Sequence, residues 1–122
     1  MIFGWLRRRA EARLRSLAGA GEIELMDGSA NSFGVESRGA AQIRGNGCLA
    51  LTDDELLFVM WLPLRELRIS RDRITLIERT RSHLGKTVGR PLLRVRFADE
   101  IGRDDSVAWL VRDLPAWEAA LA

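Results

Sequence analysis

The stretch at residues 45–78 constrains the fold most, because it holds short apolar segments separated by turn residues, with no interval long enough for a helix. Its segments are rich in Val, Ile, Leu and Phe and are bounded by Gly, Asn, Asp or Pro, which is typical of strands. Successive strands joined by turns form an antiparallel sheet that curls into a barrel or a sandwich. The sequence therefore predicts a mainly β protein.

Alternating apolar residues predict which strand positions face the core. Inward positions are expected at Leu67 and Ile69, Ile74 and Leu76, and Leu93, Val95 and Phe97. A last strand is expected at 107–111. Before residue 45, strands are expected at 22–25, 32–37 and 41–44, with Phe33 and Val35 on one face.

Turn-forming residues predict where these strands end. DGSANS (27–32) is rich in turn residues, and Asn46-Gly47 is a strong hairpin signal. Residues 82–91, with two glycines and a proline, are expected to form a loop.

A helix is predicted at each end of the chain. At residues 2–18 an apolar stripe follows helical spacing, with most arginines elsewhere; its members are Ile2, Phe3, Leu6, Ala10, Leu14 and Leu17. Gly19 and Gly21 end this helix, so we expect an arm at residues 1–21 and a β domain at 22–122. Near the C-terminus, Asp113 and Pro115 begin a short helix with Leu114, Trp117 and Leu121 on one face.

This order of elements resembles the pleckstrin-homology superfold, and more narrowly its GRAM and bacterial pleckstrin-homology-like domains. The resemblance covers about residues 30–122. It is carried by Gly47, the strand at 49–52, the turn at Asp53 and Asp54, Leu57 and Phe58, Ile69 and Ile74, and a terminal helix with an inward Trp117. It implies a pleckstrin-homology-like barrel of six to seven antiparallel strands capped by a short C-terminal helix, with the N-terminal amphipathic helix separate from it.

Charge is concentrated near the N-terminus. The first 21 residues hold five arginines and one glutamate, whereas the net charge of the whole chain is +2. A basic arm on a nearly neutral body indicates an anionic partner. The single Cys48 fits a reducing compartment, and six apolar residues before an arginine run are not a secretory signal. We therefore expect a cytoplasmic protein, peripheral on the inner face of the membrane.

The chain offers no catalytic constellation. Gly85-Lys86-Thr87 lacks the preceding glycine and following helix of a phosphate-binding loop. His83 is expected to be an exposed loop residue, and Cys48 a small core residue. The three acidic pairs, 53–54, 99–100 and 104–105, fall in predicted turns. We expect no enzyme, no cofactor and no metal site.

Arginines on consecutive strands form a candidate anion-binding surface, and they are Arg68, Arg71, Arg73, Arg79, Arg81, Arg94 and Arg96. Interspersed acids would neutralise much of it, which leaves a plain solvated face as the alternative. Nucleic acid is not expected, because binding it would require aromatic residues among these arginines.

The N-terminal helix gives the leading hypothesis, a non-catalytic module peripheral to an anionic membrane surface. Its expected contact residues are Phe3, Trp5, Leu6, Arg7, Arg8, Arg9 and Arg13. The same stripe could instead pack on the barrel or on a second subunit. The alternative function is a protein–protein adaptor or homo-oligomeric scaffold that uses this helix or an edge strand near Pro63.

Overall fold

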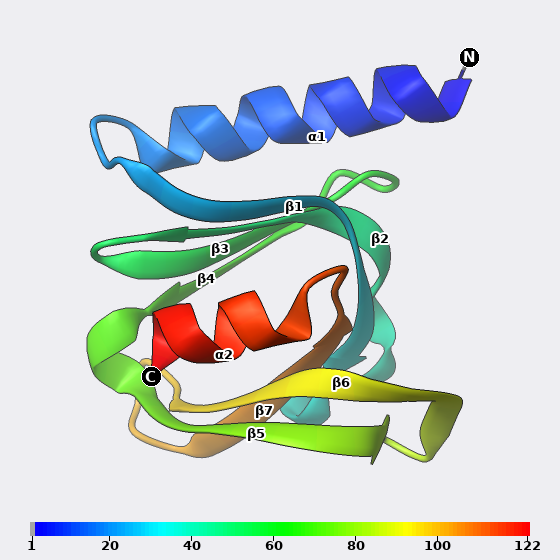
Figure 1. Cartoon of the computed structure of the whole chain (residues 1–122), viewed down its shortest axis with the longest axis vertical. Helices are drawn as coiled ribbons and strands as arrows, with labels where there is room; N and C mark the ends of the chain where they lie inside the picture. Colours follow the sequence, from blue (N-terminus) through cyan, green and yellow to red (C-terminus); the bar gives the residue numbers. More distant parts are fainter. Residues whose placement is uncertain (1) are drawn as a thin grey trace.

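The computed structural model describes residues 2–122, with the backbone alone for residue 2 and residues 38–42. It contains two α-helices, seven strands and two short 3₁₀ turns (Figure 1). In chain order these are α1 (Ile2–Ala18), β1 (Ile23–Val35), η1 (Glu36–Arg38), β2 (Gly39–Thr52), β3 (Glu55–Met60), β4 (Glu66–Ser70), η2 (Arg71–Arg73), β5 (Ile74–His83), β6 (Lys86–Ala98), β7 (Asp104–Leu110) and α2 (Leu114–Leu121).

The strands form one antiparallel sheet in the order β4-β3-β2-β1-β7-β6-β5. β1 pairs with β2 along most of its length and with β7 near its C-terminal end, so it joins the two halves of the sheet. The sheet curls into a half-barrel, and α2 lies across its open side (Figure 1). The predicted mainly β architecture with seven strands and a terminal helix is confirmed.

The main core fills the concave side of this sheet. The rings of Phe58 and Trp109 meet there with centroids 5.7 Å apart and a tilt of 57°, an arrangement that aromatic pairs favour. α2 contributes Leu114 and Trp117, which are both buried. Its first turn is capped by the side chain of Asp113, which accepts a hydrogen bond from the Ala116 amide at 3.2 Å. The predicted inward position of Trp117 is confirmed.

A second core lies on the convex side, beneath α1. Ala10 and Leu14 pack there against Ala50 of β2 and against Leu57 and Val59 of β3. Ala10, Leu14 and Leu17 of the predicted apolar stripe therefore pack on this chain's own sheet, which was one of the alternatives, whereas Phe3 of the same stripe is exposed. Because residues 48–51 of β2 and 56–60 of β3 are covered on both faces, these segments read as continuous apolar runs instead of alternating ones.

Four predicted turns or loops are wrong, and one of them is the turn at the acidic pair 104–105, since β7 begins at Asp104. Residues 27–32 lie inside β1, and Asn46-Gly47 lies inside β2. Gly47 is needed for close packing, because a Cβ there would lie 2.5 Å from the Val59 carbonyl oxygen. Residues 82–91 belong mostly to the hairpin of β5 and β6, which turns at Leu84 and Gly85. Both have positive φ, 52° and 77°, as a tight two-residue hairpin turn requires.

Two predicted side-chain directions are also wrong, and an irregularity in the strand pairing explains each. Val35 joins the main core, whereas Phe33 packs with Leu92 and Ala108 in a third cluster. The register shifts between Phe33 and Val35, where Gly34 has a φ of 101°. A second shift follows Ile74, so that Leu76 is exposed and Ile77 packs on the core instead.

Candidate functional site

The N-terminal half of α1 is tied to the loop at residues 61–65, which joins β3 to β4 and lies beneath the helix in Figure 1. Arg9 makes this link, because its Nη2 donates to the Trp61 carbonyl at 3.1 Å. The Arg9 guanidinium also stacks over the Trp5 ring, 5.1 Å from its centroid. One turn later Arg13 forms a bidentate ion pair with Glu66, at 2.9 and 3.1 Å. These contacts hold the N-terminal half of α1 against the loop and against the start of β4, and the three segments form one end of the molecule.

This end carries four of the large apolar side chains that remain exposed, Phe3 at 62%, Trp5 at 54%, Leu62 at 65% and Leu64 at 42%. Arg8 and Arg65 are exposed beside them, and among the described side chains neither has a carboxylate partner. We call these six residues the helix–loop surface. Exposed apolar groups with adjacent cations suit an interface between water and an anionic lipid surface.

The remaining contact residues expected on the helix have partners within the protein. The side chain of Leu6 on α1 is buried. Arg7 lies over β1, where its guanidinium leaves no room for a Cβ at Gly28. Arg9 and Arg13 bind the loop and Glu66 as described, and hydrogen bonds from Arg13 hold the pKa of Glu66 below its usual range. Of the seven residues expected from the sequence, Phe3, Trp5, Arg8 and Arg13 are exposed to solvent, and Arg13 among them is paired with Glu66.

The sequence analysis missed the loop's contribution to this surface. Leu62 and Leu64 flank Pro63 at the end of the apolar run that begins at residue 56. The run continues past the end of β3, since that strand stops at Met60. Apolar residues that extend beyond a strand and surround a proline are the signal that could have indicated an exposed loop surface.

The arginines of the candidate anion-binding surface are bound to groups of this protein. Five of them face carboxylates: Arg68 binds Glu55, Arg71 binds Glu24, Arg79 binds Glu118, and Arg94 and Arg96 share Glu78. Arg73 and Arg81 donate to the backbone carbonyls of Asp99 and Gly89. Hydrogen bonds from Arg94, and then from Arg96, lower the pKa of Glu78. Four carboxylates therefore balance most of the charge of these five arginines, whereas Arg73 and Arg81 bond to neutral carbonyls and keep their charge.

The single histidine and the single cysteine are both buried. The prediction that His83 is an exposed loop residue is wrong, because β5 extends to this residue and its Nε2 lies 2.9 Å from the Gly34 carbonyl. Burial lowers its pKa, and its Nδ1 has no partner among the described groups. Cys48 is a buried core residue, as predicted, and burial raises the pKa of its thiol to about 11.

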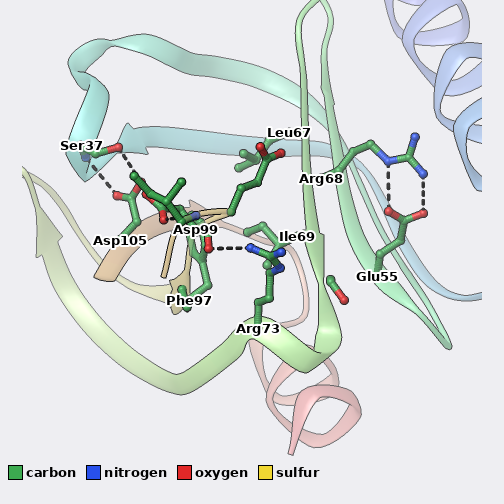
Figure 2. Close-up of a pocket in the computed structure, with 13 residues that line it drawn as sticks. Ser37, Glu55, Leu67, Arg68, Ile69, Arg73, Phe97, Asp99 and Asp105 are labelled. Atoms are coloured by element: carbon green, nitrogen blue, oxygen red, sulfur yellow. Dashed lines mark hydrogen bonds and ion pairs between the residues drawn. The ribbon is translucent and has the colours of Figure 1, made fainter. Parts of the chain in front are cut away.

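A cleft of about 670 Å³ lies between β4 and the turn that joins β6 to β7 (Figure 2). Its floor is apolar and its rim carries several carboxylates. Within the described residues, no group of three or more His, Cys, Asp or Glu side chains is placed to hold a metal ion. Neither of the described helices is long and apolar enough to cross a membrane.

No family model, curated protein or solved structure matches this chain. The helix–loop surface and the cleft are therefore the features from which a function can be inferred.

Proposed function

We propose that this protein is a non-catalytic, pleckstrin-homology-like binding module that attaches peripherally to an anionic membrane surface, on the inner face of the membrane. The fold supports the comparison in general terms, through seven antiparallel strands in one curled sheet and a C-terminal helix with a buried Trp117. The membrane hypothesis depends on one observation: Phe3, Trp5, Leu62 and Leu64 are exposed on two segments that Arg9 ties together, and Arg8 and Arg65 are exposed on the same segments.

The size of this surface is sufficient for reversible attachment. An aromatic side chain can bury roughly 150–250 Å², so the exposed half of Trp5 offers about 100 Å² and about 2.5 kcal/mol at about 25 cal/mol per Å². Leu62 offers a similar amount on the same scale, and each arginine near an anionic surface adds about 1 kcal/mol. Leu6, Ala10 and Leu14 stay in the protein core in this mode, and Phe3 and Trp5 at the exposed end of the helix make the contact.

Vesicle flotation with the full chain tests the proposal. We expect binding to vesicles of phosphatidylcholine with phosphatidylglycerol, weaker binding to phosphatidylcholine alone, and release at high salt. Trp5→Ser and Leu62→Ser should each lower the partition coefficient at least about tenfold, which corresponds to about 1.4 kcal/mol. The matched control is Val88→Ser, which changes an exposed apolar residue on the β5–β6 hairpin, far from the helix–loop surface.

Charge is tested in the same way. Arg8→Gln should weaken binding to the anionic vesicles, whereas Arg90→Gln, an exposed arginine on β6, should not. Binding that is independent of anionic lipid, or that is unchanged in Trp5→Ser and Leu62→Ser, would refute the proposal. Deletion of α1 is a poor test, because it would expose the apolar face of β2 and β3.

A further inference from the structure

The cleft runs along the free edge of β4, the outer strand of the sheet. Four consecutive residues of this strand, 67–70, line the cleft. Because successive side chains point to opposite faces of a strand, the cleft borders β4 at its edge and reaches both faces. The opposite wall comes from the end of β6, the β6–β7 turn and the start of β7. In Figure 2, Leu67, Ile69 and Phe97 lie near Asp99 and Asp105 around this space.

The pairing of β4 with β3 determines which backbone groups point into the cleft. The Met60 amide donates to the Arg65 carbonyl at 2.7 Å, and the Arg71 amide donates to the Asp54 carbonyl at 2.9 Å. Both bonds belong to the register that pairs Phe58 with Leu67. Hydrogen-bonded positions alternate along an antiparallel strand. The amides of Arg68 and Ser70 therefore point away from β3, toward the free edge.

The side chains around this edge combine an apolar floor with an acidic rim. Leu67, Ile69 and Phe97 form the floor, and Ile101 stands on the rim with 71% of its surface exposed. The rim carries Asp99 and Glu100, and the buried Asp105 also lines the cleft.

The cations of the cleft neutralise this rim only in part. Arg68 is matched by Glu55 through bonds of 2.8 and 3.0 Å. Arg73 donates to the backbone carbonyl of Asp99, so its single charge offsets one of the three carboxylates. Asp105 is buried and accepts hydrogen bonds from the amide and hydroxyl of Ser37 and from the Ser106 amide. The rim keeps an excess of negative charge.

We propose that an extended, cationic peptide segment of a partner protein binds in this cleft and adds to β4 as an eighth strand. Its backbone bonds the outward amides of Arg68 and Ser70, its apolar side chains cover Ile101 and the floor, and its Lys or Arg side chains face the acidic rim. β4 has five residues, or about 17 Å at about 3.4 Å per residue, so a segment of about five residues fills the edge. Charge complementarity selects this partner, because an acidic peptide would meet the same carboxylates with repulsion. This binding mode goes beyond the proposed membrane attachment and uses a different face.

Amide NMR of the full ¹⁵N-labelled chain tests the proposal with two capped nine-residue peptides. One peptide alternates valine with lysine, and the other alternates valine with glutamate. We expect saturable shifts of the Arg68, Ser70 and Ile101 amides with the lysine peptide, and at least about tenfold weaker binding of the glutamate peptide. Equal binding of the two peptides, shifts confined to other strands, or no saturable binding of the lysine peptide up to millimolar concentration would overturn the proposal.

Two pairs of variants sharpen the test. Ser70 has a φ of −62°, which proline adopts without strain, so Ser70→Pro removes the outward donor and leaves the pairing with β3 intact. It should abolish binding of the lysine peptide, while Ser70→Ala should bind as the wild type does. Glu100→Lys should weaken binding at least about tenfold, and the matched charge change Asp53→Lys, in the exposed β2–β3 turn, should not.

The variants also distinguish a second copy of this chain from a foreign peptide. If light scattering showed a dimer that Ser70→Pro dissociates, the edge would belong to another copy and the peptide proposal would be wrong. Unchanged binding of the lysine peptide by Ser70→Pro or by Glu100→Lys would also contradict it.

Discussion

Replacement of Leu14 by alanine tests whether α1 is part of the folded unit. Leu14 is fully buried, and it packs over the convex face of the sheet among Ala50, Leu57 and Val59. Leu→Ala changes at buried sites cost about 2–5 kcal/mol, and the cost depends on how far the surroundings can collapse. The neighbours here lie on β2 and β3, and β2 is paired on both of its sides, so little collapse is available. Alanine's higher helix propensity returns only a few tenths of a kcal/mol.

We therefore expect Leu14→Ala to lower the free energy of unfolding by about 3 kcal/mol. A chain of 122 residues is stable by roughly 6–18 kcal/mol, so this is a large and measurable fraction. The control is Leu62→Ala, the same chemical change at a side chain that is mostly exposed, which should cost about 0.5 kcal/mol or less.

Urea unfolding followed by far-ultraviolet circular dichroism and by tryptophan fluorescence measures both values. The two signals should report one transition, because the helix and the sheet share a core. The reasoning would be refuted by a cost below about 1 kcal/mol for Leu14→Ala. A loss of helical signal before the tryptophan transition would refute it as well.

Two further predictions concern the buried titratable groups. Burial raises the pKa of Cys48 to about 11. Its reaction with a disulfide reagent near pH 8 should therefore be at least about 100-fold slower in the native protein than in guanidinium chloride. Comparable rates in the two conditions would show that the thiol is not buried. Because burial lowers the pKa of His83 below its usual value of 6.5, the unfolded chain binds a proton first as the pH falls. The free energy of unfolding should then decrease below about pH 6.5, ahead of the losses from Glu66 and Glu78, whose lowered pKa values act below 4.5. Urea titrations at about pH 7 and about pH 5 on the wild type and on His83→Gln check this, and a wild type that is more stable at the lower pH would contradict the sign.

The sequence by itself determined the elements that have a local physical signature. Apolar alternation located the strands from residue 45 onward, with inward positions at Leu67, Ile69, Leu93, Val95 and Phe97 that the structure confirms, although two of the turns expected there are strand residues. The terminal helix was visible from its capping Asp113 and its apolar face. In each case the local pattern and the tertiary environment agree, so the pattern alone is sufficient.

The tertiary structure decided the features that depend on what lies opposite a residue. Gly47 looked like a turn residue, yet it is a strand residue pressed against the Val59 carbonyl. His83 is buried because the β5–β6 hairpin carries it to Gly34, which is 49 residues away in sequence. The helix–loop surface and the cleft each join segments that are distant along the chain. A local pattern records the preference of a short segment, whereas burial, close approach and charge pairing depend on contacts made between segments only after the chain has folded.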